Sequence, residues 1–412
     1  MTTNRSLSPS TVLTLLISMG FIGSFAMIVM PPLFSEIITD INLTKAQMGS
    51  LMGITMLSAI IFAPIGGMVA DKIGCRWTMG IGTLVVAVAG GLRGAMVTPF
   101  GLIACMFIIG VGFNFLMPSI PKVLGQWFTP DKLAFTNGLN VAGAGVGGAI
   151  GVATAASLLS PAFGGWRGVM VATSVCVFLT GILWVLIYRD PIAEDSVKAQ
   201  NTLMLANFKR VAKLKNIQLL AAMALFQSLG FLPVMSFLPI SLEERGIAHA
   251  GELTGIVMAT AVVFNIIGGR ISDRIGKRKP IIFFGTAIAG FCVLTYASLS
   301  TIPLILVLMI TGAGVGSLAP VMLTIPIEME EVGPELAATA VGFILMFQSI
   351  SGFFGPILAG KLIDITSYTV GFIFMGCAII LSALFVIPMK EPARGTGKVV
   401  AAPVKEAATS SE

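Results

Sequence analysis

GMVADKIGCRW, at residues 67–77, is a short charged stretch between two long apolar segments, and it recurs as GRISDRIGKRK at residues 269–279. We call these stretches hinge 1 and hinge 2. Glycine aligns with glycine and aspartate with aspartate at an offset of 202, which is close to half of the 412 residues. The same offset relates Gly53 to Gly255, Gly110 to Gly312, Gly112 to Gly314 and Pro118 to Pro320. The sequence therefore predicts two homologous halves.

Composition places both halves in a membrane. Hydrophobic residues make up 56% of the chain and charged residues only 11%, with a mean hydropathy of +0.97, whereas soluble domains are about 25% charged. A helix needs about 20 apolar residues to cross the hydrocarbon core, and apolar runs of that length fill most of the sequence. Residues 281–299 are apolar on all sides, unlike the alternating segments of about 10 residues in a transmembrane barrel. We expect an all-α polytopic membrane protein.

Short polar breaks divide the apolar runs into twelve expected transmembrane helices, arranged as two pseudo-symmetric six-helix bundles. The expected parts are an N-terminal tail at 1–10, a first bundle at 11–189, a central linker at 190–216, a second bundle at 217–389 and a C-terminal tail at 390–412. For the linker two interpretations stay open, a solvated connection or a basic amphipathic turn on anionic headgroups.

The distribution of cations predicts the orientation. With the N-terminus in the cytoplasm, 20 of the 25 Lys and Arg residues fall in cytoplasmic loops and tails, in agreement with the positive-inside rule. Both termini and both hinges are then cytoplasmic, in a multi-pass protein of the cytoplasmic (inner) cell membrane.

The sequence carries no sign of an enzyme or of a bound cofactor. Five cysteines are scattered without ligand spacing, and the single histidine, His249, has no neighbouring cysteine or paired carboxylates that would make a metal site. A Walker-type phosphate loop is lacking as well. We expect no metal, no cofactor and no nucleic-acid partner, since topology explains the cations.

The two hinges resemble the loop signature G-x-x-x-D-[R/K]-x-G-[R/K]-[R/K] of the major facilitator superfamily. Hinge 2 matches at Gly269, Asp273, Arg274, Gly276, Lys277 and Arg278. Hinge 1 matches at Gly67, Asp71, Lys72, Gly74 and Arg76, with Cys75 where a cation is usual. The resemblance covers the whole chain and implies two bundles that rock about a midplane site. It also implies that helices 1, 4, 7 and 10, expected at 11–36, 102–123, 217–242 and 303–327, line the cavity. Helices 2, 5, 8 and 11, expected at 47–70, 133–159, 253–269 and 336–360, would form the seam. The hinges would lock the cytoplasmic side of the two halves together when the outside is open.

An acidic run precedes helix 11. Its members Glu328, Glu330 and Glu331 are candidate gate partners for Lys72 and Arg76. Exposed ion pairs contribute about 0 to 1 kcal/mol each, which is enough to bias two nearly balanced states.

Polar side chains inside the crossings are the candidates for substrate contact, because such groups usually face a cavity or a partner. They are Asn114, Lys122, Asn140, Gln227 and Gln348. Asn114, Pro118 and Lys122 share one helix face by their spacing of four. Helix–helix hydrogen bonding is an equal alternative for the amides, and snorkelling to the interface is the favoured alternative for Lys122. For Arg93, near the outer end of helix 3, snorkelling or an inter-helix hydrogen bond is favoured over an anion site.

These features predict a secondary active or facilitative transporter that moves a small solute by alternating access, acts as a monomer in the lipid bilayer, and prefers a small organic anion. Proton coupling is not assumed, because the expected crossings contain no Asp or Glu away from their ends. One alternative is efflux of apolar drug-like compounds, which 23 Met and 27 Phe could accommodate. An alternative of another class is a receptor that binds a ligand without transporting it.

Overall fold

The computed structural model describes residues 7–190, 204–329 and 331–391, which form helices and connecting turns without a β-strand. Nine helices within these ranges are long and apolar enough to cross a membrane. One of them, α3 (Lys45–Arg93), runs for 49 residues with a non-helical residue in its middle. Two shorter apolar helices are also present, α12 (Lys279–Thr295) and α15 (Tyr368–Leu384). The all-α membrane fold is therefore confirmed, whereas the count of twelve crossings stays a prediction.

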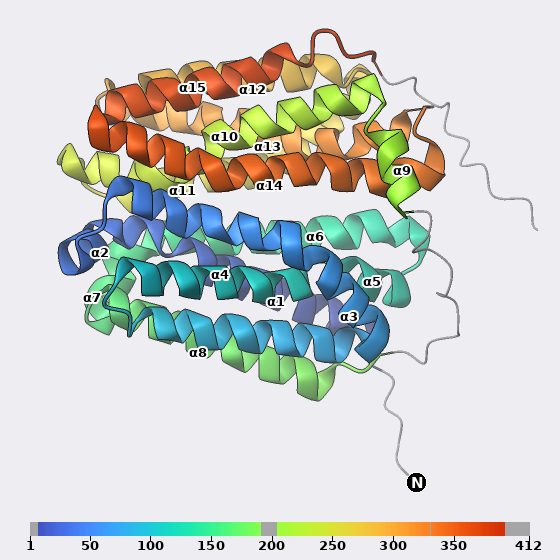
Figure 1. Cartoon of the computed structure of the whole chain (residues 1–412), viewed down its shortest axis with the longest axis horizontal. Helices are drawn as coiled ribbons and strands as arrows, with labels where there is room; N and C mark the ends of the chain where they lie inside the picture. The colour runs from blue at the N-terminus through green and yellow to red at the C-terminus, as the bar shows by residue number, and fades with distance from the viewer. Residues whose placement is uncertain (1–6, 191–203, 330, 392–412) are drawn as a thin grey trace, which may run out of the picture.

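The helices form two bundles that lie side by side (Figure 1). The first consists of α1 (Pro9–Ile28), η1 (Pro31–Leu33), α2 (Phe34–Ile41), α3, α4 (Pro99–Leu116), α5 (Ser119–Trp127), α6 (Pro130–Thr154), η2 (Ala155–Leu159), α7 (Ser160–Phe163) and α8 (Trp166–Ile187). The second consists of α10 (Lys215–Glu244), α11 (Ala250–Ile275), α12, α13 (Thr301–Glu328), α14 (Gly333–Ile365) and α15. Both hinges lie at one end of the molecule, the hinge end, and we call the opposite end the distal end.

A short amphipathic helix, α9 (Met204–Val211), lies between the bundles in sequence. The ring of Phe208 lies 5.2 Å from the ring of Phe343 on α14, and Val211 is fully buried, while Lys209 and Arg210 are exposed. The described part of the expected linker is thus packed against the second bundle through its apolar face.

Each hinge turns at a glycine with a left-handed backbone. Gly74 has φ 82° and divides α3 into two arms, and Gly276 has φ 74° and ends α11. Only glycine adopts these angles without strain. The repeat at an offset of 202 therefore preserves a glycine with positive φ as well as a pattern of charge, although ψ differs, at 163° for Gly74 and 9° for Gly276.

The seam between the bundles repeats in the same way. The first arm of α3 packs on α14, and α11 packs on α6. A Cβ on Gly53 would collide with the carbonyl oxygen of Phe353, and one on Gly255 would lie 3.3 Å from that of Ala149. Two positions related by the repeat thus allow the close approach of helix backbones across the seam.

Among the described residues, the buried hydrophobic cores of the two bundles join at the distal end only. One buried cluster contains Phe34 and Met48 of the first bundle together with Phe237 and Ile363 of the second. Toward the hinge end each bundle has a separate cluster, around Val123 and Trp184 in the first and around Ile325 and Phe343 in the second. The bundles are therefore closed against each other at the distal end.

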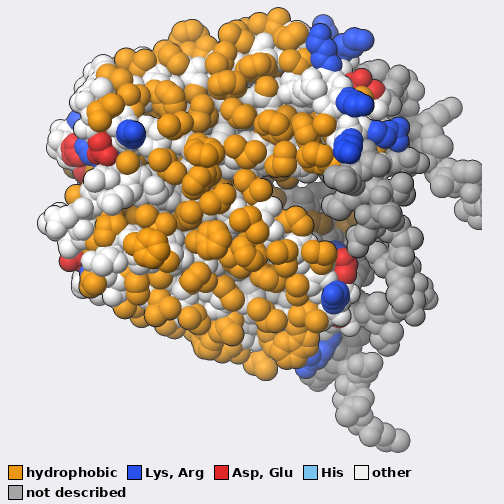
Figure 2. Space-filling model, in the orientation of Figure 1, with side chains coloured by type: hydrophobic (Ala, Val, Ile, Leu, Met, Phe, Trp, Pro, Cys, Tyr) orange, Lys and Arg blue, Asp and Glu red, His pale blue; other side chains and the backbone are white. Residues whose placement is uncertain are grey.

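The surface agrees with a protein that spans a membrane. Hydrophobic side chains cover the middle of the face seen in Figure 2, and most of the Lys and Arg side chains visible there gather at the hinge end. A hollow lies between the two bundles toward the same end (Figure 2).

Candidate functional site

A cavity of ≈ 550 Å³ opens in the first bundle, lined by α1, α3, α4, α5 and α6. Its wall runs from Ile28 to Pro121 and Asn137 toward the hinge end. Most of the lining is apolar and includes five methionines, Met19, Met27, Met56, Met79 and Met117. The described lining contains no Asp, Glu, Lys or Arg, and its polar side chains therefore determine which polar groups of a solute it can bind.

Asn114 is one of the sequence candidates that line this cavity. It is 6% exposed, and its Nδ2 donates to the carbonyl oxygen of Gly110 at 2.7 Å and to Ser58 Oγ at 3.3 Å. Ser58 in turn donates to the carbonyl oxygen of Thr55 at 2.6 Å. These bonds fix the orientation of the Asn114 amide against α3.

Asn140 also lines the cavity and is 6% exposed. Its Oδ1 is buried without a hydrogen-bond partner among the described residues, and it faces Gly20 of α1, where a Cβ would lie 3.4 Å away. Asn137, one turn earlier on α6, is exposed to the cavity and was missed by the sequence reasoning. Asn137 and Asn140 are three residues apart, which places both amides on one helix face. This spacing could have identified Asn137 as a cavity residue from the sequence.

Lys122 does not line the cavity. Its Nζ forms an ion pair with Asp71 of hinge 1, and both side chains are partly exposed. Met117 and Pro118, between α4 and α5, keep helical backbone angles, so the chain continues in one direction across the proline. Met117, Ile120 and Pro121 line the cavity, whereas Lys122 pairs with Asp71.

The other two predicted amides lie outside the described lining. Gln227 of α10 is buried, and its Oε1 accepts a hydrogen bond from Ser382 of α15 at 3.3 Å. This contact joins two helices of the second bundle, which favours the packing interpretation. Gln348 is half-buried on α14.

Hinge 1 is held by α8 and by the residues that follow it. Arg76 donates from Nε and Nη2 to the carbonyl oxygen of Val185 at 2.9 and 2.7 Å. Asp190 accepts from the backbone amides of Cys75 at 2.9 Å and Arg76 at 3.2 Å, and so caps the second arm of α3. Burial raises the pKa of the Asp190 carboxyl above its ordinary value of 3.8, and the Cys75 amide partly offsets this effect.

Hinge 2 is capped in the same way by Glu391, which accepts from the amides of Arg278 and, at 3.4 Å, Lys279. Neither acid was predicted from the sequence as a cap. The available signal was Arg189-Asp190-Pro191 and Lys390-Glu391-Pro392, a repeat at an offset of 201.

The predicted gate partners have other contacts in this structure. Glu328 pairs with Arg278 at 2.6 Å, and Glu331 accepts from Asn216 at 2.7 Å, both within the second bundle. The expected pairing of Glu328 and Glu331 with Lys72 or Arg76 is not found in this structure. That pairing was expected in a state open at the distal end, whereas here the distal end is closed and the cores of the two bundles are separate toward the hinge end. Glu330 lies outside the described residues. A gating role for the run stays a prediction.

The remaining hinge residues are mostly at the surface. Lys72, Arg274 and Lys277 are exposed, and Gly67 and Gly269 are half-buried.

The two bundles are linked at the distal end by a polar cluster, the distal latch, made of Lys45, Glu244, Asp364 and Tyr368. Asp364 of α14 accepts from the backbone amides of Lys45 and Ala46, both at 3.0 Å, at the first turn of α3. Lys45 Nζ pairs with Glu244 at 3.2 Å and lies 4.1 Å from the centre of the Tyr368 ring. Tyr368 also donates to Glu244 at 2.9 Å. A carboxylate of one bundle thus caps a helix of the other.

Arg93 is 2% exposed and has only neutral partners among the described residues. It donates to the carbonyl oxygens of Gly90 and Ala26, both at 3.3 Å, and contacts Met106 Sδ at 3.6 Å. These contacts join α3, α1 and α4, so the inter-helix hydrogen bond is the interpretation that the structure supports over snorkelling.

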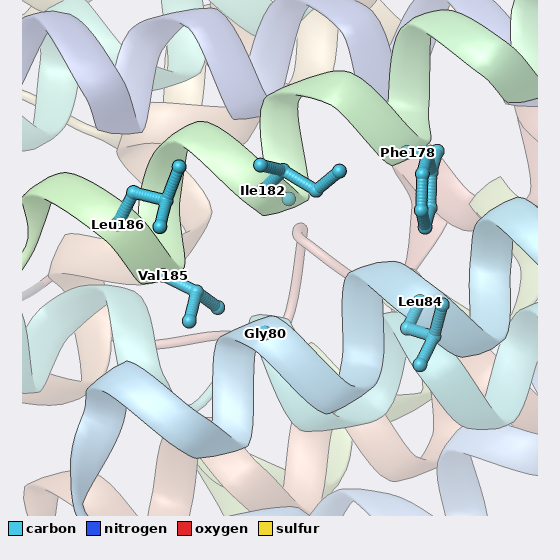
Figure 3. Close-up of a pocket in the computed structure, with 7 residues that line it drawn as sticks. Gly80, Leu84, Phe178, Ile182, Val185 and Leu186 are labelled. Atoms are coloured by element: carbon cyan, nitrogen blue, oxygen red, sulfur yellow. The ribbon is translucent and has the colours of Figure 1, made fainter.

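A second, shallower pocket of ≈ 270 Å³ lies between the second arm of α3 and α8 (Figure 3). Gly80 and Leu84 face Phe178, Ile182, Val185 and Leu186 across it. Leu84, Phe178, Ile182 and Leu186 are largely exposed hydrophobic side chains, as expected of a surface that contacts lipid. We therefore take the larger cavity as the candidate functional site.

Comparison with known proteins identifies the family. The profile of the Major Facilitator Superfamily matches residues 15–261 and 220–410. The chain belongs to the Major Facilitator Superfamily. It is thus a multi-pass membrane transporter of small solutes and not an enzyme, as the hinges predicted.

Relatives and solved structures are similar over nearly the whole chain. A hexuronate transporter of Bacillus subtilis is 22% identical over 86% of this chain and 88% of its own length. A probable nitrate transporter of Staphylococcus aureus is 25% identical over 86% and 90%. A probable sulfoacetate transporter of Cupriavidus necator is 22% identical over 92% and 93%.

Among solved structures, a point mutant of the nucleoside transporter NupG has a TM-score of 0.77 at 16% identity, covering 92% of this chain and 99% of that one. A bacterial homologue of the human lysosomal transporter Spinster, in an inward-facing and unoccupied conformation, has a TM-score of 0.74 at 16% identity, covering 92% and 95%. At this identity the likeness supports the fold alone.

Proposed function

We propose that this superfamily member moves a small organic anion across the cytoplasmic membrane by alternating access. The observation that carries the proposal is the similarity, over most of the chain, to relatives named for anionic solutes. The described cavity wall adds carboxamides among apolar side chains and contains neither a carboxylate nor a cation. Hexuronate, nitrate and sulfoacetate, the solutes in the names of these relatives, are all anions, which supports a negatively charged solute for this protein.

The proposal includes an orientation. The concentration of Lys and Arg at the hinge end (Figure 2) supports a cytoplasmic location of that end and of both termini. The distal end, closed by the latch and the joint hydrophobic cluster, then faces outward. Because the cavity lies within one chain, a monomer suffices for transport.

Uptake into proteoliposomes tests the proposal. Purified protein is reconstituted, and labelled glucuronate, sulfoacetate and nitrate are offered singly, with and without an imposed pH gradient. We expect saturable uptake of at least one organic anion above protein-free vesicles. Saturable flux of organic cations instead of anions would contradict the proposal.

A second function is favoured by the five methionines of the cavity wall. Methionine adapts its shape to irregular apolar ligands, so efflux of apolar drug-like compounds is the competing proposal. The same vesicles loaded with a fluorescent apolar dye decide between the two, because dye flux without anion flux would support efflux. Saturable binding without any flux would support the receptor alternative.

A further inference from the structure

The hydrogen-bond directions at the cavity wall are fixed by the groups behind it. The carbonyl oxygen of Gly110 can only accept, so the Asn114 atom 2.7 Å from it must be the amide nitrogen. Ser58 donates its only hydroxyl proton to Thr55, so its oxygen must accept from the same Asn114 nitrogen. Both Asn114 amide protons are thus directed at the protein, and Oδ1 is the atom left for an occupant of the cavity.

Thr55 offers an occupant the same chemistry. It lines the cavity and donates its hydroxyl proton to the carbonyl oxygen of Met52 at 2.8 Å. Its oxygen can therefore only accept a further hydrogen bond.

Asn140 adds a third acceptor on the facing helix α6. Its Oδ1 is buried against Gly20 of α1 and has no partner among the described residues, so it can accept from an occupant once the side chain turns toward the cavity. An acceptor that is buried and left unpaired costs about 1–3 kcal/mol, so an occupant that donates to it would be favoured over one that cannot.

We infer that the solute carries hydroxyl groups as well as its anionic group, and that Asn114, Thr55 and Asn140 accept hydrogen bonds from those hydroxyls. The hydroxyls of a hydroxylated organic anion satisfy these three acceptors, whereas an anion without donors leaves them unpaired. The amide of Asn137 and the hydroxyl of Ser24 also line the cavity and can donate to the anionic group. The inference rests on the proposed function for the charge of the solute. The hydroxyl groups are indicated only by the three polar side chains, because the apolar part of the lining does not favour a hydroxylated solute.

A pair of six-carbon carboxylates tests the inference, gluconate with five hydroxyl groups and hexanoate with none. Competition by each against the anion that proteoliposomes take up gives the two inhibition constants. Sites built to bind a hydroxyl discriminate strongly against analogues that lack it, and we expect gluconate to bind at least tenfold more tightly. Equal binding, or a preference for hexanoate, would overturn the inference while leaving anion transport intact. A lack of any anion flux would instead contradict the proposed function.

Two variants test the named residues, Asn140→Leu and Thr55→Val, each with the same number and branching of side-chain heavy atoms as the original. The ratio of the two inhibition constants is measured within each variant, so a loss of folded protein does not affect it. We expect the ratio to fall at least threefold in each. Gln218→Leu is the matched control, because the Gln218 amide bonds to the carbonyl oxygen of Ala212 at the exposed hinge end of α10. An unchanged ratio in both cavity variants would overturn the assignment.

Discussion

Hinge 1 requires a residue without a side chain at position 74, and this residue is Gly74. Its φ of 82° and ψ of 163° lie outside the regions open to other residues, and a Cβ there would collide with the carboxylate of Asp190. A non-glycine residue held in such a conformation costs about 1–3 kcal/mol. We therefore expect Gly74→Ala to lower the melting temperature of the detergent-solubilised protein.

Gly125 provides the control for that measurement. It lies within α5, and a Cβ there meets no atom within 4 Å. Gly125→Ala is expected to leave the melting temperature unchanged or raise it slightly, since alanine favours the helix. If the two variants melted alike, the positive φ of Gly74 would not be what the hinge requires.

The location of a single residue could be predicted where helical spacing alone determines its surroundings. Its partners could not be predicted where the packing of another helix supplies them. Asn114 and Asn140 were expected at a solute site, and both line the cavity. Lys122, for which snorkelling to the interface was the favoured interpretation, pairs with Asp71 at the hinge end and does not line the cavity. The partner of Arg76 could not be predicted, since the carbonyl oxygen of Val185 is brought to it only by the packing of α8 against α3.

At the scale of elements, Asp190 and Glu391 are related caps, each following the last helix of its bundle and holding the start of the helix after a hinge. Replacing an N-cap acid by alanine costs about 0.5–2 kcal/mol. We expect Asp190→Ala and Glu391→Ala each to lower the melting temperature, and the double variant to show the sum of the two effects. Additivity is expected because the caps share no partner.

Amide exchange measured by mass spectrometry locates these effects. Each variant is expected to exchange faster in the first turn after its own hinge, at residues 75–79 or 279–283, and not after the other. Faster exchange at both hinges in a single variant would mean that the two hinges are coupled, and would contradict the independence of the two caps.

The helices themselves were the most predictable elements, because long apolar runs and the repeat at an offset of 202 determine them. Their breaks were less so. Pro118 and Pro320 occupy equivalent positions, yet α4 and α5 are separated near Pro118 while α13 continues through Pro320. The π-helical turn η2 at Ala155–Leu159 likewise has no marker in the sequence.

At the scale of the whole molecule, the distal latch and the joint hydrophobic cluster hold the bundles together at one end, while the hinge end keeps two separate cores. Alternating access requires the reverse arrangement as well, so the latch must open in each cycle. Many residues contribute to the hydrophobic contacts that close the distal end. Among the polar contacts, Asp364 accepts two hydrogen bonds from backbone amides of the other bundle.

Asp364→Ala should therefore shift the protein toward a state open at the distal end. Two hydrogen bonds with a net worth of about 1 kcal/mol each are lost, and a change of about 1.4 kcal/mol corresponds to a tenfold shift between two states. Spin labels on cysteines at Leu158 and Ile302, exposed distal residues of different bundles, report the separation in a background without the native cysteines. We expect the longer distance to gain population in Asp364→Ala.

Asp40→Ala is the matched control for the latch. Asp40 is a distal acid whose partners, the Trp166 ring nitrogen at 3.0 Å and Arg167 at 2.9 Å, belong to its own bundle. Its loss removes as many contacts but none across the seam, so the label distances should stay as in the parent. If Asp40→Ala lengthened them as much as Asp364→Ala, general weakening of the distal end would explain the change. If neither variant altered them, the joint hydrophobic cluster alone would close this end, because its burial of Phe34, Met48, Phe237 and Ile363 is independent of the latch.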